Sequence, residues 1–180
     1  MKALIVFMFS ISIACLSCSN PITSSFKTAT PEEFGRTLLE TCIENDSSTY
    51  AKLIITETGL LKYLEESAEY KKSKPNIQLF SRALVESTFE KNNGRLKESF
   101  GYVMDDFKRE GITDLKNAKV VKVESKDLSK NNIYWINTAF EVNGNQFIIR
   151  CSNVYVVPGE GFRIFREYPS VYKVHPSSTR

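Results

Sequence analysis

The chain has 180 residues, 42% of them hydrophobic and 25% charged, and its 24 lysines and arginines barely outnumber its 21 acidic residues. That size fits one globular domain that can bury a core without disulfide staples. The small net charge of +3 is mixed along the chain, which argues against nucleic acid or a strongly acidic macromolecule as the partner.

Residues 1–17 form a predicted export leader. Lys2 gives a positive start, and the uncharged apolar run ALIVFMFSISIACL follows it. The run has the length of a secretory core and is short for a membrane span. It ends at Leu16-Ser17-Cys18, and a polar stretch, SNPITSSFKTAT, comes directly after.

This order of apolar leader, small residue, cysteine and polar tether resembles the relaxed lipoprotein box of Gram-negative bacteria. The resemblance implies that the thiol of Cys18 is acylated and that residues 18–29 tether the domain to a membrane. Cys15, after Ala14, is the second candidate. Ser19 in place of an aspartate indicates the outer membrane. A plain secreted protein and an uncleaved anchor are the alternatives.

Residues 30–174 are predicted to be a single α+β domain, followed by a flexible tail at 175–180. The spacing of apolar residues is helical from Thr30 to about Gly111, and a capping box with proline begins the first helix at Thr30. Asn93-Gly94 is expected to separate helices over 76–91 and 95–110. In the first of these we expect Ile77, Phe80 and Leu84 to lie in the core.

A strand period follows, from Asn117 to about Tyr168. Asn143-Gly144 between two alternating runs predicts a two-residue hairpin, and Pro158 to Gly161 predicts a second one. The expected sheet is a four-stranded antiparallel meander whose apolar face is covered by the N-terminal helices. The predicted pairs of the first hairpin are Val142–Asn145, Phe140–Phe147, Thr138–Ile149, Ile136–Cys151 and Tyr134–Asn153.

A capped helix, the run CIENDSSTYAKLI, and the closing hairpins FEVNGNQFIIR and VVPGEGFRIFRE together resemble the nuclear transport factor two-like cone fold. The resemblance covers Thr30 to about Tyr168. It implies helices lying across a curved sheet, and it carries no catalytic signature. The fold hosts enzymes, carriers and binding modules alike.

Polar residues on the apolar face suggest a ligand site. In the expected register Tyr134, Asn153 and Arg166 form one row across three strands, and Tyr155 lines the same wall. A guanidinium beside an amide and a phenol suits a carboxylate or phosphate. The alternative is an open rim where Arg166 pairs with a helix glutamate.

The opposite face has a mixed composition that suits water or a protein partner. Trp135, Ile148 and Arg150 are the expected anchors of such an interface, as in an immunity or assembly lipoprotein. The alternative is that the C-terminal segment PSVYKV covers this face.

Cys42 and Cys151 are both expected to point into the interface between helices and sheet. They could form a disulfide, or they could be two separate buried thiols; the sequence leaves both open.

Catalytic chemistry is sparse. The single histidine, His175, lies in the tail, and Asp105-Asp106 is expected on a solvated helix face. No metal-ligand spacing or phosphate-binding loop appears, so we expect no metal and no cofactor.

The sequence therefore favours a lipid-anchored, non-enzymatic domain of the bacterial envelope that binds a small, anionic ligand or a protein partner. A cavity enzyme using Tyr134 is the remaining alternative.

Overall fold

A computed structural model describes residues 28–128, 132–165 and 167–174 of the chain. Its helices are α1 (Pro31–Ile43), α2 (Ser47–Leu53), α3 (Glu57–Glu66), α4 (Ala68–Lys72) and α5 (Pro75–Arg109). None of these described helices is both long and apolar enough to cross a bilayer. The predicted lipidation site Cys18 and the tail with His175 lie outside the described residues.

All strands follow the helices and form one antiparallel sheet. The strands β1 (Lys119–Asp127), β2 (Ile133–Val142), β3 (Asn145–Val157) and β4 (Gly161–Ile164) make the expected meander. The α+β class, with N-terminal helices followed by an antiparallel sheet, is therefore confirmed. A fifth strand, β5 (Ser170–Lys173), shares the outer edge of β3 with β4. The expectation that PSVYKV could cover the sheet is thus wrong, since this segment pairs at its edge.

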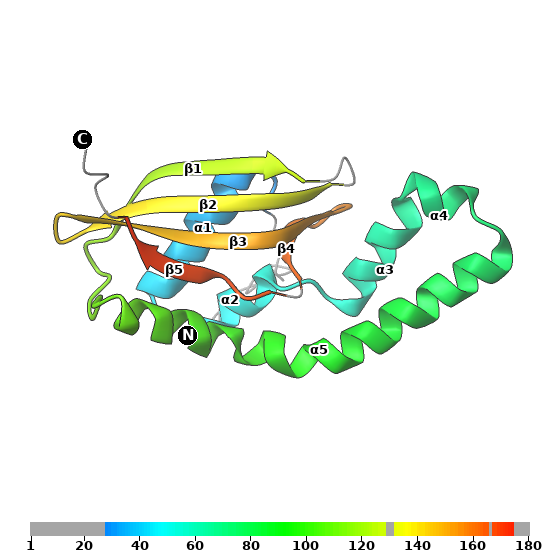
Figure 1. The fold of residues 1–180 in the computed structure, drawn as a ribbon, viewed down its shortest axis with the longest axis horizontal. Coiled ribbons are helices and arrows are strands. Elements are labelled where there is room, and N and C mark those ends of the chain that lie inside the picture. The colour runs from blue at the N-terminus through cyan, green and yellow to red at the C-terminus, as the bar shows by residue number, and fades with distance from the viewer. Residues whose placement is uncertain (1–27, 129–131, 166, 175–180) are drawn as a thin grey trace, which may run out of the picture.

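Helix α1 lies behind the sheet in Figure 1, and α5 runs along the edge formed by β5. The capping box is present: Thr30 Oγ1 accepts the Glu33 N–H, and the Glu33 carboxylate accepts the Thr30 N–H. Gly35 lets α1 approach β2 closely, because a Cβ there would meet Thr138 Oγ1 at 2.4 Å. We call the face under α1 the inner face and the opposite one the outer face.

The first hairpin has the predicted turn. Asn143 and Gly144 have φ values of 51° and 73°, the left-handed conformation that a two-residue type I′ turn needs. Four predicted pairs are confirmed, and they are Val142–Asn145, Phe140–Phe147, Thr138–Ile149 and Ile136–Cys151.

The register changes beyond Cys151. A bulge places Val154, and not Asn153, opposite Tyr134, and Asn153 takes a positive φ of 57°. The second hairpin is also shifted by one residue: a four-residue turn over Pro158 to Gly161 would pair Val157 with Phe162, but Val157 pairs with Gly161. The two errors have different causes: the first is an inserted residue, for which a strict period of two has no place, and the second is a loop one residue shorter than expected.

At the end of β3, beyond the bulge, the two faces of the strand contribute side chains to two different hydrophobic cores. Val154 belongs to the main core under α1, whereas Tyr155 belongs to a smaller cluster near α3. The main core includes Phe34, Leu38, Cys42, Phe107, Phe140 and Ile149. The smaller cluster consists of Ile55, Leu60, Tyr155, Val157 and Phe165.

The predicted break at Asn93-Gly94 is absent, and α5 is one helix of 35 residues. A single glycine costs about 1 kcal/mol in a helix, which the helical residues on both sides can offset. Figure 1 shows α3, α4 and the first half of α5 extending away from the sheet. We call α3, α4 and residues 75–91 the helical projection, and the rest of the described chain the body.

The apolar residues of the projection are not core, contrary to expectation. Ile77, Phe80 and Leu84 are 48%, 68% and 56% exposed. On the other side of α5, Val85 packs toward the smaller cluster and Arg82 pairs with Glu65 of α3. The helical period was right, but α3 covers only one side of α5.

Two carboxylates, one from Asp106 in α5 and one from its C-cap residue Glu110, hold β5 in place. Asp106 Oδ2 accepts the Val171 N–H at 3.2 Å, and Glu110 Oε2 accepts the Lys173 N–H at 3.1 Å. Asp106 is only 5% exposed, so its assignment to a solvated face was wrong. Its neighbour Asp105 is exposed as expected and pairs with Lys108.

Candidate functional site

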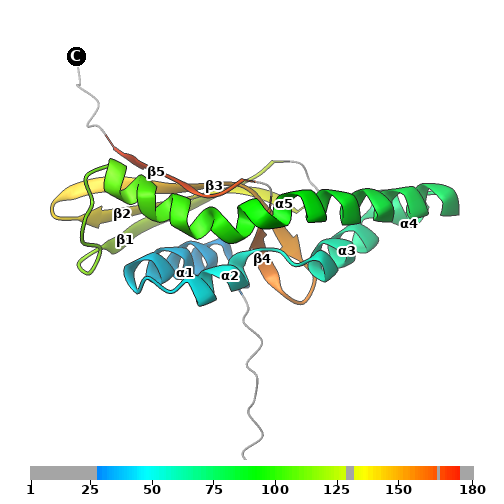
Figure 2. The same cartoon turned by 90° about the horizontal axis from the view of Figure 1, so that it is seen from below.

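The outer face of the sheet is the candidate site, because no described helix lies over most of it; only its far end, at Tyr155 and Val157 of β3, packs against α3. In Figure 1 strands β1, β2 and β3 are unobstructed from the front, and Figure 2 shows α1 and α2 on the other side of the sheet. Alternation along the strands places Trp135 and Asn137 of β2, Ile148 and Arg150 of β3, and Tyr172 of β5 on this face. We call these five residues the outer-face cluster.

Arg150 is held between two aromatic rings. Its guanidinium carbon lies 5.5 Å from the centre of the Trp135 ring and 4.8 Å from that of Tyr172. The sheet produces this arrangement, since Arg150 pairs with Asn137 on one side and with Ser170 on the other. A cation over an aromatic face is stabilised by about 0.5–1 kcal/mol when exposed and by more when desolvated.

Two oxygens of the cluster lack hydrogen-bond partners within the described chain. Asn137 Oδ1 and Tyr172 Oη are both buried, and Asn137 as a whole is 6% exposed. Leaving a buried polar group unsatisfied costs about 1–3 kcal/mol. The face therefore combines a positioned guanidinium and aromatic surface with unused hydrogen-bonding capacity.

The edge strand β1 has features that disfavour pairing with a strand of another chain. β1 pairs only with β2 among the described strands, so one side of it is an open edge. It carries Lys119, Lys122 and Lys126, with a register shift between Val120 and Lys122. Lysines and bulges on edge strands disfavour pairing with another chain. The flat face is thus a better candidate surface than the edge.

The predicted ligand row lacks its pairing of Tyr134 with Asn153. Tyr134 packs its ring on Phe162 at 5.3 Å, whereas Tyr155 packs on Tyr63 at 4.9 Å in the other cluster. Asn153 sits in the bulge between them, and Arg166 lies outside the described residues. The sequence did carry a sign of the bulge. Apolar residues of the inner face fall at every second position at Phe147, Ile149 and Cys151, and a strict period would continue at 153 and 155. The next apolar residues on that face are instead Val154 and Val156.

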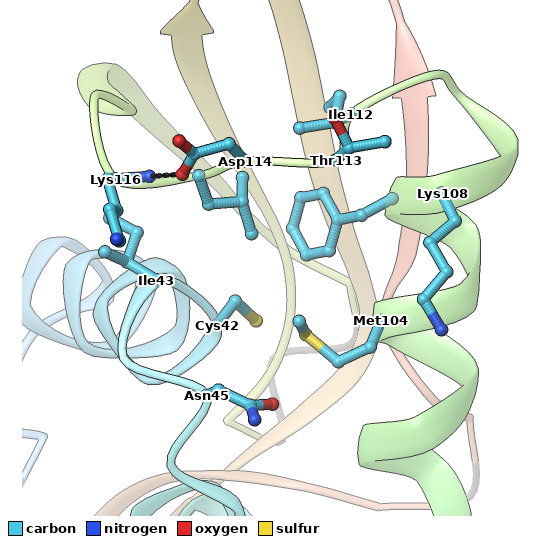
Figure 3. A pocket seen from close by; sticks show the side chains of 11 residues that line it. Cys42, Ile43, Asn45, Met104, Lys108, Ile112, Thr113, Asp114 and Lys116 are labelled. Atoms are coloured by element: carbon cyan, nitrogen blue, oxygen red, sulfur yellow. Dashed lines mark hydrogen bonds between the residues drawn. The ribbon is translucent and has the colours of Figure 1, made fainter.

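A cavity of about 190 Å³ lies between the C-terminal ends of α1 and α5. Figure 3 shows Cys42 and Met104 pointing toward each other across it, and Asp114 accepts the Lys116 N–H at its rim. Burial raises the pKa of Cys42 to about 12, so this thiol stays protonated and is a poor nucleophile at neutral pH. The volume is also below that of ordinary ligand pockets.

Cys151 is likewise buried, and burial raises the pKa of its thiol. Both Cys42 and Cys151 are free in the structure. The two therefore stand as separate thiols, which is one of the two arrangements the sequence left open.

A second cavity, of about 330 Å³, lies between α3, α4 and the far end of the sheet. Tyr63, Glu66 and Glu69 line it together with Asn132 and Val156. Burial raises the pKa of Tyr63 to about 12, and Tyr155 and Glu69 add to the effect. Its carboxylates make it unsuited to the anionic ligand expected from the sequence. No group of three or more potential metal ligands occurs in the described part of the chain.

Sequence reasoning missed a buried arginine. Arg163 on β4 is 4% exposed and donates to Thr28 Oγ1 at 3.0 Å and to the Phe162 carbonyl at 2.8 Å. Burial lowers the pKa of its guanidinium, and Glu160 opposes this effect. Thr28 also bonds to Phe162 through both its backbone carbonyl and its hydroxyl. Arg163 thus fastens the start of the described chain to the sheet, a contact between residues 135 positions apart that no local pattern signals.

Comparison with known proteins gave no family assignment: no protein-family model, no curated protein and no solved structure matched the chain.

Proposed function

We propose that the chain is a lipid-anchored binding domain of the bacterial envelope that holds a protein partner on the outer face of its sheet. The observation that carries the proposal is the outer-face cluster, in which Arg150 is stacked between Trp135 and Tyr172 on an uncovered face. Tryptophan, tyrosine and arginine are the residues that most often dominate binding energy at protein interfaces.

The chemistry of the cluster indicates what the partner presents. Ile148 and the two rings offer apolar contact, and Arg150 can form a paired hydrogen bond to a carboxylate. The buried oxygens of Asn137 and Tyr172 add polar capacity that becomes available when side chains rearrange on contact. An acidic side chain next to an aliphatic or aromatic one is therefore the expected epitope.

The partner reading has more support than the small-ligand reading. Tyr134 and Tyr155 pack in different clusters, so they do not converge on one ligand. Tyr134 also packs against Phe162 beside the main core and lines neither of the two cavities described above. Membrane attachment through Cys18 rests on the leader and tether in the sequence.

Site-specific photo-crosslinking in a bacterial host tests the proposal. A photoreactive residue at Ile148 should give one discrete adduct, and the matched probe at the exposed Glu40 on α1 should not. Arg150→Ala should reduce the adduct at least tenfold, since truncating an interface hot spot costs about 2 kcal/mol or more. Equal adducts at both positions, or an adduct indifferent to Arg150→Ala, would reject the outer face as the binding surface.

A further inference from the structure

The helical projection carries an exposed apolar surface at its far end. Leu79 and Phe80 are 70% and 68% exposed, and Leu84 and Ile77 lie on the same three turns of α5. Figures 1 and 2 both show this end of α5 lying well away from the sheet. Large apolar side chains gathered on an exposed segment mark an interaction site more often than scattered single ones do.

The same end is basic. Lys71 and Lys72 are exposed in the last turn of α4, and Lys74 is exposed in the connection to α5. Lys71 is bound to Glu66, whereas Lys74 precedes α5 at its N-cap, and no side chain caps the first turn of the helix. The positive end of the helix dipole therefore adds to the lysine charges at this tip. Apolar and basic groups together match the interface of an anionic bilayer.

The position of the acidic residues on α5 allows the tip of the projection to approach a membrane first. Glu86 and Glu90 are exposed on α5 but lie further back, toward the body. Glu66, which pairs with Lys71, and Glu69 also lie near these lysines, so the excess positive charge at the tip is small. The first turn of α5 itself carries no acidic residue, so it can reach the headgroups while Glu86 and Glu90 stay in water.

The tether can bring the tip to the membrane. Thr28 is fixed to β4, and the ten residues from Ser19 to Thr28 span at most about 35 Å. Residues 75–91 of α5 extend about 25 Å at 1.5 Å per residue. A domain attached at Cys18 is therefore held close enough for the projection to touch the same bilayer.

We propose that the tip of the helical projection docks on an anionic phospholipid surface, with Leu79 and Phe80 entering the interface and Lys72 and Lys74 contacting the headgroups. Docking at a second point fixes how the domain stands on its membrane. The reach of the tether rests on the lipid attachment proposed above, whereas binding by the tip itself does not.

Vesicle co-sedimentation of a chain that begins at Ser19 tests this directly, without leader or lipid. Such a chain should fold, because both core clusters are formed by residues between Phe34 and Val171. It should sediment with vesicles of phosphatidylethanolamine and phosphatidylglycerol and much less with phosphatidylcholine vesicles. Added salt should weaken the binding, because the lysine contribution is electrostatic.

Three variants locate the surface. Phe80→Glu and the double variant Lys72→Glu/Lys74→Glu should each lower partitioning more than about tenfold. Val121→Glu is the matched control, since Val121 is 55% exposed on β1 of the body. Because the substituted positions are all exposed, the thermal unfolding temperature should be unchanged in all three variants.

The outcomes separate this proposal from its rivals. Absence of sedimentation by the native sequence, or binding equal to native by Phe80→Glu, would overturn it. The native chain could instead form a dimer that Phe80→Glu dissociates, without binding vesicles. That result would show that the tip contacts a second copy of the chain, and it would also overturn the proposal. Arg150→Ala should leave vesicle binding intact while losing the crosslink at Ile148, so this proposal and the proposed function fail independently.

Discussion

The body and the helical projection use similar apolar residues in opposite ways. In the body, Phe34, Phe107 and Phe140 are almost fully buried between α1, α5 and the sheet. In the projection, Leu79 and Phe80 face outward although they lie on the same helix as Phe107. One continuous helix thus has a core-building half and an exposed half.

The difference shows that helical periodicity identifies a helix but does not identify what covers it. The second half of α5 packs on the sheet, and the carboxylates of Asp106 and the C-cap residue Glu110 also hold β5. The first half packs on α3 and, through Val85, on the smaller cluster, and these contacts cover one side of it. The cost of exposing large apolar side chains is the reason to expect that the projection has an external partner.

The largest expected contrast comes from matched phenylalanine truncations. Phe140 is fully buried and contacts the rings of Phe107 and Phe147, so Phe140→Ala should lower the free energy of unfolding by about 3–5 kcal/mol. Phe80→Ala in the projection should change it by less than about 0.5 kcal/mol. Urea denaturation followed by circular dichroism measures both. Similar losses would mean that the projection is buried in solution and would remove the comparison.

Two helical glycines give the next contrast. A Cβ at Gly35 would clash with Thr138 and press on Val123, so Gly35→Ala should cost about 1–3 kcal/mol. Gly101, inside α5, has nothing within 4 Å of its Cβ position, and Gly101→Ala should stabilise by about 0.5–1 kcal/mol. Thermal unfolding of the two variants should shift in opposite directions. A stabilised Gly35→Ala would show that α1 does not lie close against β2.

The pH dependence of stability should also distinguish the body from the projection, because both buried thiols, Cys42 and Cys151, lie in the body. The pKa of Cys42 is about 12 in the fold and 9.0 ordinarily, so its contribution to stability is complete below about pH 9 and is lost as the pH rises toward 12. The loss amounts to at most about 1.4 kcal/mol per pH unit for one group. Urea unfolding between pH 8 and about 11 should show this decline, and Cys42→Ala should reduce its slope, leaving the part due to Cys151. An equal slope in the variant would place the titrating groups elsewhere.

Local signals predicted the parts of the fold that local chemistry controls. The capping box at Thr30 and the turn at Asn143-Gly144 each satisfy their hydrogen bonds within a few residues. The alternation next to that turn then determined four strand pairs. Features of this kind can be found by inspecting a short window of sequence.

The candidate site was found only in part. Trp135, Ile148 and Arg150 were predicted on the exposed face, but Tyr172 joined them through β5, a four-residue strand with too little sequence to show a period. The row of Tyr134 and Asn153 failed at a bulge, where one extra residue changes which side chains meet. Arg163 and Thr28 meet across most of the chain, and no spacing encodes such a contact.

The fastening of Thr28 to β4 has a mechanical consequence. Because the hydrogen bonds from Thr28 to Phe162 and Arg163 come before α1 in the chain, a force applied at the N-terminal end loads them first. The load then passes into β4 and β3 and bypasses the first turn of α1. If residues 18–29 tether the domain to a membrane as proposed, a pull on them would break these hydrogen bonds before it disturbs the core.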